Sequence, residues 1–137
     1  MDRSPKPEII YRDDVRPKVA DIIALYRDAP LNRPITDPDR IRQSFEGSNI
    51  VWTAWAGARL AGIVRAWTDG ARDGYICDLA VHPDFQKMGI GKELLTRVVT
   101  SNGYVQFVLR SSPIAEAYYP HVGWKKVGNG WFWPRRA

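Results

Sequence analysis

Residues 78–95 constrain the fold of this chain more than any other stretch: Asp-Leu-Ala-Val-His-Pro-Asp-Phe-Gln-Lys-Met-Gly-Ile-Gly-Lys-Glu-Leu-Leu. The run from Tyr75 to Val81 is apolar apart from Asp78, which predicts a buried strand. Pro83 ends that strand, because proline has no N–H to donate and its φ is fixed. Apolar residues then recur at helical spacing and predict a helix over about residues 89–100; they are Ile90, Leu94, Leu95, Val98 and Val99.

Two glycines, Gly89 and Gly91, therefore stand at the start of a helix that follows a strand. A helix N-terminus has unpaired N–H groups and a positive dipole end, so it can hold a phosphate group. A P-loop would need glycine at position 86 and serine or threonine at 93, where the chain has Gln86 and Glu93. A dinucleotide loop would need a third glycine at 94, which is leucine. What remains is Gln86-x-x-Gly89-x-Gly91 after a strand.

This pattern resembles the coenzyme A signature of the GNAT superfamily of N-acetyltransferases, Q/R-x-x-G-x-G/A after a strand. The resemblance implies that the strand's splayed main chain pairs with the pantetheine arm of acetyl-CoA and that the loop's N–H groups hold its pyrophosphate. Ser112 stands in a region where many members contact the pantetheine through asparagine. The residues implied in cofactor binding are Leu79, Ala80, Val81, Gln86, Lys87, Met88, Gly89, Ile90, Gly91, Lys92 and Ser112. The alternative is a tight strand-to-helix turn that needs glycine for packing.

The remaining elements predict an α+β fold around one mixed, mostly antiparallel sheet. Helices are predicted over about 15–28, from the Asp37 cap to Gly47, and from the Ser112 cap to Tyr119. Strands are predicted over 8–11, 49–56, 59–68 and 104–109, the last parallel to the central strand, with a final hairpin over 123–127 and 131–133. The order β-α-α-β-β-β-α-β-α-β-β, with about four helices and about six or seven strands, is that of a compact GNAT domain covering residues 1–137.

A second resemblance concerns the acid of the reaction. Tyr118-Tyr119-Pro120-His121-Val122-Gly123-Trp124 matches the family's aromatic-Tyr-x-x-x-Gly-Phe pattern with tryptophan in the last place. The resemblance gives Tyr119 the role of protonating the departing coenzyme thiolate, and a phenol is a competent acid for that step. Tyr118 is the alternative acid, and Tyr119 packing against the pantetheine is the alternative role.

The attacking amine must lose a proton, and the tetrahedral intermediate needs a donor for its oxyanion. Asp78 is the ionisable group of the central strand, and we expect burial to raise its pKa towards that of a useful base. The alternative is a carboxylate that ties down a neighbouring loop by hydrogen bonds. His82 is a second candidate base. By resemblance, the backbone N–H of Val81 is the oxyanion donor.

The amine acceptor is implied, again by resemblance, to enter between residues 31–36 and residues 128–131. Trp67, Trp131 and Trp133 are candidates for an aromatic wall there, although core packing is the default role of each. The segment from Arg65 to Gly70 weakly resembles arylalkylamine-type members.

Composition narrows the number of domains, the partners and the cellular compartment that are expected. The chain has 137 residues, 45% hydrophobic, which suits one domain with one core. The net charge of +5 comes from basic residues spread along the chain without a basic stripe, so we expect no nucleic-acid partner. A mild basic excess is equally expected for a site that holds a polyanionic cofactor. No apolar run approaches the length of about 18 residues that spans a membrane, and residues 1–7 do not resemble a signal peptide. With Cys77 as its single cysteine, the sequence predicts a cytoplasmic protein without a disulfide.

The expected function is transfer of an acetyl group from acetyl-CoA to a primary amine of a small molecule or peptide, without a metal. A non-catalytic acyl-CoA-binding regulatory module is the rival function. A nucleic-acid binder is a third, which would ignore coenzyme A and bind with steep salt dependence. A homodimer through the C-terminal strands is a further expectation by family resemblance.

Overall fold

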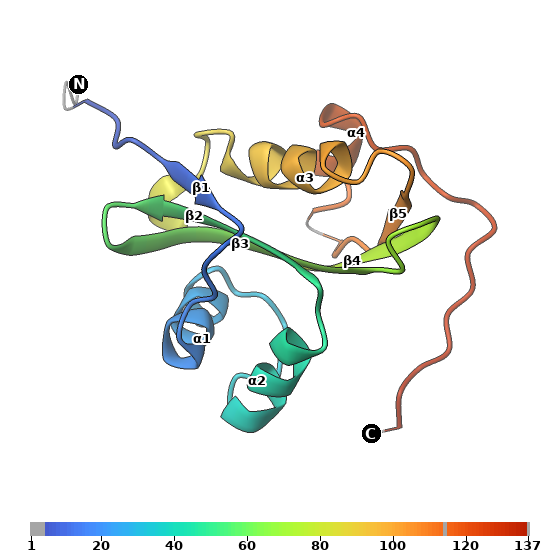
Figure 1. Ribbon diagram of the computed structural model, residues 1–137, viewed down its shortest axis with the longest axis horizontal. Helices are drawn as coiled ribbons and strands as arrows, with labels where there is room; N and C mark the ends of the chain where they lie inside the picture. Colours follow the sequence, from blue (N-terminus) through green and yellow to red (C-terminus); the bar gives the residue numbers. More distant parts are fainter. Residues whose placement is uncertain (1–4, 114, 137) are drawn as a thin grey trace.

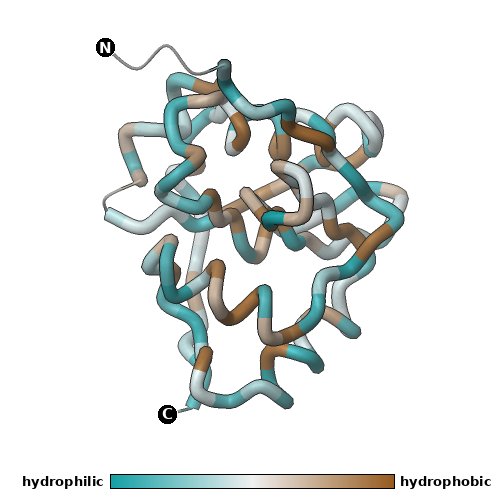
Figure 2. The backbone as a smooth tube through the Cα atoms, turned by 90° about the vertical axis from the view of Figure 1, so that its left-hand side faces the viewer, coloured by the Kyte–Doolittle hydropathy of each residue, from teal (hydrophilic) through white to brown (hydrophobic). Residues whose placement is uncertain are grey.

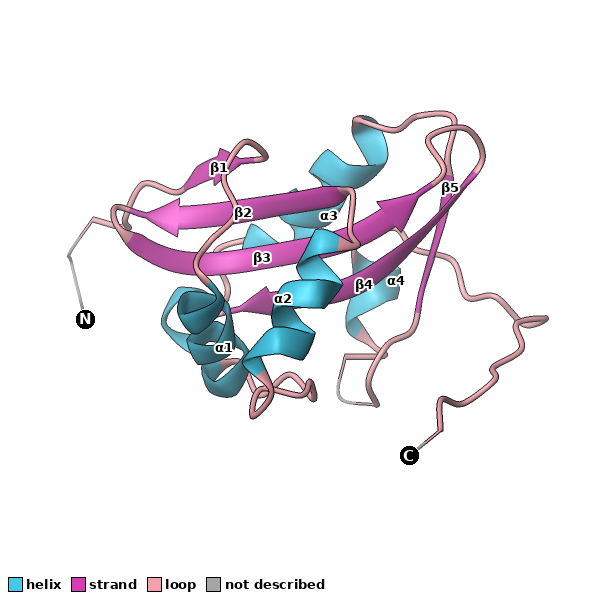
Figure 3. Ribbon diagram, turned by 60° about the horizontal axis from the view of Figure 1, so that its bottom comes forward, coloured by secondary structure: helices cyan, strands magenta, loops and turns pink. Residues whose placement is uncertain are grey.

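The computed structural model describes residues 5–113 and 115–136, which form one mixed sheet with helices on both faces (Figures 1 and 3). The elements are β1 Ile10–Arg12, α1 Val19–Asp28, α2 Pro38–Glu46, β2 Ile50–Ala56, β3 Arg59–Thr68, β4 Asp73–Val81, a 3-10 turn Pro83–Phe85, α3 Ile90–Thr100, β5 Gln106–Leu109 and α4 Tyr118–His121. The α+β class and the predicted order are confirmed as far as α4.

The strands lie in the order β1-β2-β3-β4-β5. All neighbours are antiparallel except β4 and β5, which are parallel as predicted for strands joined by a crossover helix. Helices α1 and α2 cover one face of the sheet, and α3 and α4 lie on the other (Figures 1 and 3).

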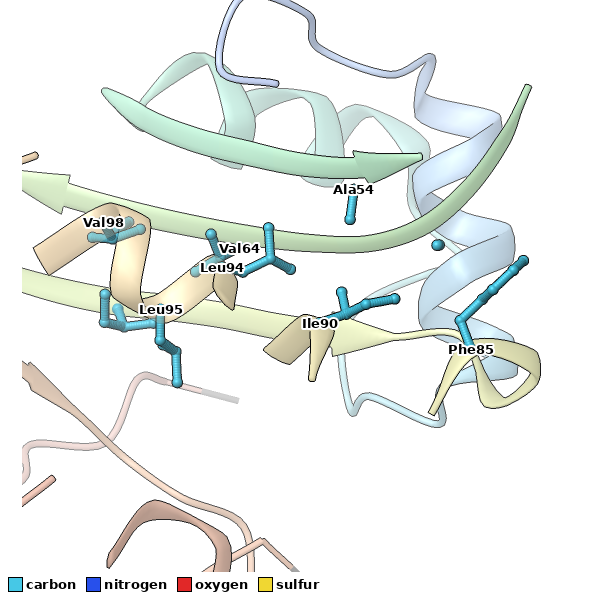
Figure 4. Close-up of a cluster of buried hydrophobic side chains, with 10 residues drawn as sticks. Ala54, Val64, Phe85, Ile90, Leu94, Leu95 and Val98 are labelled. Carbon is cyan, nitrogen blue, oxygen red and sulfur yellow. The ribbon is translucent and has the colours of Figure 1, made fainter. Parts of the chain in front are cut away.

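Each face of the sheet buries its own apolar cluster. The α3-side cluster is Ala54, Ala61, Val64, Ala66, Ile76, Phe85, Ile90, Leu94, Leu95 and Val98 (Figure 4). The α1-side cluster is Ile22, Leu25, Tyr26, Ile41, Phe45, Val51, Ile63 and Ala80. Hydrophilic and hydrophobic residues are interspersed along the chain (Figure 2), because each amphipathic helix places one face against the sheet and the other towards solvent.

Helix α1 begins at Val19, whereas the sequence predicted a start near Val15. Pro17 explains the difference, since a proline disfavours the helical conformation in the residue before it. Arg16 is instead extended away from the helix, and its guanidinium donates to the carbonyls of Phe45 and Ser48. Helix α2 follows the prediction: Asp37 is the N-cap, its carboxylate accepts from Arg40 N at 3.2 Å, and Pro38 opens the first turn.

The predicted C-terminal hairpin is wrong for the described residues. The sheet has five strands, and no strand is present between residues 110 and 136 in the part of the chain that is described. Residues 124–136, here called the C-terminal arm, run as an extended segment away from the sheet (Figure 1). A two-stranded hairpin is marginal unless one face packs on a core, and Trp131 and Trp133 are 99% and 93% exposed.

The last helix is also shorter and later than predicted. Ser112 does accept a cap-like bond from Ala115 N, at 3.3 Å to its Oγ, but α4 covers only Tyr118–His121; residue 114 of the predicted helix lies outside the described part. Pro120 explains the later start, because a proline is tolerated only in the first turn of a helix. Among the described helices, none has the length and apolar character needed to cross a membrane.

Candidate active site

The carboxyl end of β4 has a backbone edge that β5 does not cover. Pairing of the two strands ends at Ile76 and Leu109, whereas β4 continues to Val81. Among the described residues, no strand pairs with residues 77–81 on that side. Strand groups without a ladder partner can bind an extended ligand, so this edge can pair with an amide-bearing chain.

A register shift lies at the same point of the sheet. Arg65 faces Asp78 and Ala66 faces Ile76, so Cys77 has no partner across the ladder. Such a bulge bends and twists a strand. Accordingly Ile76 belongs to the α3-side cluster, whereas Ala80 belongs to the α1-side cluster and the half-buried Leu79 and Val81 pack on the α3 side. Strand β4 therefore leaves β5 where its own regular geometry is interrupted.

The segment from Gln86 to Lys92 connects β4 to α3 and presents a run of free backbone donors. Gly89, the residue before α3, has φ 76°, and Lys87 has φ 64°. Gln86 N donates to Pro83 O at 3.4 Å, and the next N–H that donates to a carbonyl is Glu93 N, at 3.0 Å to Gly89 O. No described atom accepts from the N–H groups of residues 87–92, and the helix has no side-chain cap. The buried side chains of Phe85 and Ile90 anchor the segment on both sides.

Gly91 brings together the glycine segment, β4 and α4. A Cβ atom at this position would lie 2.8 Å from the hydroxyl oxygen of Tyr118 and 3.8 Å from Cγ2 of Val81. A side chain here would therefore displace the Tyr118 hydroxyl. An acyl carrier with a pyrophosphate and an amide-containing arm suits this arrangement. The N–H groups of residues 87–92 can bind the pyrophosphate, and the uncovered edge of β4 beside Gly91 can pair with the arm.

The structure distinguishes the two tyrosines that the sequence left as alternatives. Tyr118, not Tyr119, has its hydroxyl at Gly91. The ring of Tyr119 packs edge-on against Trp124, at 6.3 Å between centroids, and against Tyr118 at 5.4 Å. Burial raises the pKa of both phenols, and for Tyr119 the neighbouring Tyr118 raises the pKa further.

Asp78 lies at the centre of a buried polar network. Its side chain is 2% exposed and accepts from Tyr26 Oη at 2.8 Å, Arg33 Nε at 2.5 Å and Arg65 Nε at 2.6 Å. Burial alone raises the pKa of Asp78, but the hydrogen bonds and charges of Arg65 and Arg33 outweigh burial, and the pKa lies below its ordinary value. The predicted rise in the pKa of Asp78 is therefore wrong, because the sequence did not reveal the two guanidinium groups.

The three partners of Asp78 come from distant parts of the chain. Tyr26 is on α1, Arg33 is in the loop before α2, and Arg65 is the residue opposite Asp78 on β3. Asp78 thus ties a loop to β4, as in the alternative role that the sequence left open. The one sequence signal for this network was a pair of opposite charges, Arg65 and Asp78, on neighbouring strands. That signal can be read only when the register of β3 against β4 is known.

His82 has little capacity left to act as a base. Its Nδ1 accepts from Asp84 N at 3.1 Å, so the proton of the neutral ring is on Nε2. Nε2 in turn lies 3.3 Å from a carboxylate oxygen of Asp28. Both ring nitrogens therefore face a partner.

The other predicted site residues are placed as follows. Gln86, Lys87 and Lys92 are exposed beside the glycines, and Met88 is half-buried. The side chain of Ala80 lies in the α1-side cluster, and the residue is opposite Ile63 of β3. Ser112 is exposed after β5.

The two predicted acceptor walls are not brought together. Residues 31–36 lie against β4 through Arg33, which also donates to the carbonyl of Cys77 at 2.7 Å. Residues 128–131 belong to the exposed C-terminal arm. Trp67, Trp131 and Trp133 form no aromatic pair in the described structure, although Trp67 is 47% exposed beside Tyr75.

Two hollows lie beside this region, not in it. One, of about 230 Å³, lies between α1 and the β2–β3 hairpin and includes His82. The other, of about 370 Å³, lies between the end of α3, β5 and residues 122–125. The candidate site is thus an open edge and loop, which suits an extended ligand better than a compact one.

Comparison with known proteins shows the family of the chain. A family model described as "Acetyltransferase (GNAT) domain" matches residues 26–131. The chain is 31% identical over 105 residues to an uncharacterised N-acetyltransferase of Prochlorococcus marinus, covering 72% of this chain and 57% of that protein. It is 27% identical over 97 residues to serotonin N-acetyltransferase 2 of rice, covering 66% of this chain and 48% of that protein. The chain spans about half the length of these curated relatives.

Solved structures show the same fold. A GNAT-family acetyltransferase from Streptococcus pneumoniae superposes with a TM-score of 0.76 at 21% identity, covering 95% of this chain and all (100%) of that one. An aminoglycoside N-acetyltransferase in complex with CoA superposes with a TM-score of 0.71 at 15% identity, covering 97% and 98%. With the family match over most of its length, the chain belongs to the GNAT acetyltransferase family.

Proposed function

We propose that this protein is an N-acetyltransferase that transfers an acetyl group from acetyl-CoA to a primary amine by direct attack in a ternary complex. The observation that carries the proposal is the meeting of three features at Gly91: the free N–H groups of residues 87–92, the uncovered edge of β4 and the hydroxyl of Tyr118. Family membership supports acetyl-CoA as the donor.

Each feature has a separate task in the proposal. The N–H groups of residues 87–92 bind the pyrophosphate, and the edge at residues 79–81 pairs with the pantetheine arm. The donor supplies a thioester carbonyl with a thiolate leaving group. The Val81 N–H donates to the carbonyl oxygen as negative charge develops there, and a tyrosine hydroxyl donates its proton to the thiolate.

The attacking amine must lose a proton before or during attack. Asp78 is ionised, as a base must be, but its three donors and lowered pKa make it a weak one. Its role as base stays a prediction. An amine that binds already deprotonated needs no strong base, in which case kcat/KM rises with pH towards the pKa of the free amine.

The proposed acceptors are primary amines, and three kinds of amine are distinguished by assay. The rice relative is named for serotonin, an arylalkylamine, and the segment from Arg65 to Gly70 resembles arylalkylamine-type members. Phenylethylamine is therefore the first acceptor to test, with an aliphatic diamine and a tripeptide with a free N-terminus as representatives of the other classes.

One observation favours a second function, a non-catalytic acyl-CoA-binding module. The carboxylate of Asp78 and the Nδ1 of His82 are both engaged, so the strongest candidate bases of the described site are occupied. Such a module would bind acetyl-CoA but release no coenzyme A with any amine.

Calorimetric titration with acetyl-CoA tests the proposal first. We expect a Kd of about micromolar order for the wild type and no measurable binding for Gly89→Glu/Gly91→Glu, because the new carboxylates repel phosphates and fill the space at the loop. Gly103→Glu is the matched control, since Gly103 lies in open space after α3 and lacks a positive φ.

The same protein is then assayed for coenzyme A release with the three amines. Binding with release establishes the transferase, and binding without release supports the module. A well-folded wild type that binds no acetyl-CoA would refute both functions.

A further inference from the structure

Arg33 connects the loop before α2 to the strand that carries the candidate site. Its Nε donates to Asp78 Oδ1 at 2.5 Å, and its Nη2 donates to the carbonyl of Cys77 at 2.7 Å. Its Nη1 donates back to the carbonyl of Asn32 at 2.7 Å, which fixes the side chain relative to its own loop. Each of the three guanidinium nitrogens thus donates one hydrogen bond, and the side chain is 30% exposed.

The attachment point on β4 is where the strand leaves β5. The last β4–β5 pair is Ile76 with Leu109, and the unopposed residue of the bulge is Cys77. The Arg33 fork therefore binds the first two residues of the uncovered edge, Cys77 and Asp78, immediately before the residues proposed to pair with the donor.

The two arginines at Asp78 have different tasks. Arg65 lies within the sheet and also donates to Ser44 O and Ser48 Oγ, at 3.2 and 3.0 Å, so it joins β4 to α2 and the residues after it. With Arg33 removed, Asp78 keeps its bonds to Arg65 and Tyr26. Loss of Arg33 should release the loop while β4 stays in place.

We infer that Arg33 is a positioning residue that holds residues 31–36 against the uncovered edge of β4 and so forms the acceptor side of the site. The inference rests on the proposed function, because it assigns the loop to the acceptor. Leu31 and Ile35 pack on the α1-side cluster, so the loop has apolar support of its own. Arg33 adds the directional bonds that fix its distance from the strand.

Steady-state kinetics of Arg33→Ala test the inference, with Arg40→Ala as the matched control. Arg40 is an exposed arginine in the first turn of α2, so its loss makes the same change in charge and length. We expect the KM for the best acceptor of the panel to rise about tenfold in Arg33→Ala, with kcat and acetyl-CoA affinity within about twofold of wild type. Arg40→Ala should match the wild type.

Two further variants separate positioning from general destabilisation. In Arg33→Lys the ammonium can pair with Asp78, but it lacks the planar fork that also binds the carbonyl of Cys77. The KM for the acceptor should therefore rise by an intermediate factor of about threefold. Guanidinium ion at non-denaturing concentration should lower the acceptor KM of Arg33→Ala and leave Arg40→Ala unchanged. A KM that is the same in wild type and Arg33→Ala overturns the inference.

Hydrogen exchange gives a reading that does not depend on activity. The amides of Leu31 and Ile35 donate to Tyr26 O and Arg33 O, at 2.9 and 2.8 Å, so their exchange reports on the loop. We expect exchange at both to be about tenfold faster in Arg33→Ala, with the β4 amides unchanged. If the wild type transfers no acetyl group, the proposed function fails, but hydrogen exchange still tests whether Arg33 holds the loop against β4. Unchanged exchange at Leu31 and Ile35 in Arg33→Ala would refute that role of Arg33.

Discussion

The hydroxyl of Tyr118 lies at Gly91, whereas the sequence motif assigns the catalytic proton to the next residue, Tyr119. The two can be separated by removing one oxygen atom at a time. We expect Tyr118→Phe to lower kcat about tenfold or more, because its hydroxyl is the one at the loop and the β4 edge. Tyr119→Phe should lower kcat less, since its ring packs on Trp124.

Acetyl-CoA affinity, measured by calorimetry, serves as the control for both tyrosine variants and should change little. The reverse ranking of kcat would support the motif-based assignment to Tyr119. Equal, unchanged turnover in both variants would remove a tyrosine acid from the mechanism.

The Asp78 carboxylate should support folding as well as position a loop. Replacement by asparagine leaves two guanidinium groups without their counter-charge, so Asp78→Asn should lower the free energy of unfolding by about 3 kcal/mol. Chemical denaturation measures this change. Asp39→Asn, at an exposed residue 3.6 Å from Arg42, is the control and should shift the free energy by less than about 0.5 kcal/mol.

The lowered pKa of Asp78 also predicts how stability depends on pH. A carboxyl group with a lower pKa in the folded than in the unfolded state stabilises the protein above its unfolded pKa of about 4. That contribution is lost as the pH falls through the folded-state pKa. The free energy of unfolding of the wild type should therefore fall more steeply below about pH 4 than that of Asp78→Asn. The same pH dependence in both proteins would contradict the ion pairing of Asp78.

At the scale of elements, the start of α3 depends on a left-handed residue. Gly89 has φ 76° and open space around it, so a side chain there meets no atom but strains the backbone. We expect Gly89→Ala to destabilise the fold by about 1–2 kcal/mol. Gly89→Asn should destabilise it less, because asparagine tolerates this conformation better.

Thermal unfolding of the two Gly89 variants gives the ranking, with Gly103→Ala as a control at a glycine without positive φ. Equal destabilisation by alanine and asparagine would mean that the backbone conformation is not the cause.

At the scale of the whole molecule, residues 128–136 of the C-terminal arm contribute little to the buried clusters, whereas Trp124 at the start of the arm packs on the α3-side cluster. Trp131 and Trp133 are almost fully exposed, and Phe132 contacts the guanidinium of Arg110 at 4.0 Å from its ring centroid. Deletion from Gly128 onward should therefore change the free energy of unfolding by less than about 1 kcal/mol. Denaturation of the full chain and of the variant deleted from Gly128 checks this, and a large loss would show that these aromatic residues pack in solution.

Most of the scaffold could be predicted because its signals are local. The bounds of β3 and the cap of α2 follow from alternation, Asp37 and Pro38, and the parallel β5 follows from the crossover through α3. The final hairpin was mispredicted because its turn glycines and aromatic residues are a local signal, while a strand needs a partner with which to pair. Residues 110–136 contain none in the described structure.

The sequence by itself determined the strand, the glycine segment and the helix that follows it, because spacing, proline and glycine act within a few residues along the chain. The lowered pKa of Asp78, the position of the Tyr118 hydroxyl at Gly91 and the contacts of Arg33 became visible only in the tertiary structure. Those depend on groups from α1, β3 and the loop before α2 meeting at one point of β4. A pKa and a hydrogen bond are set by distances in space, which spacing along the chain does not fix.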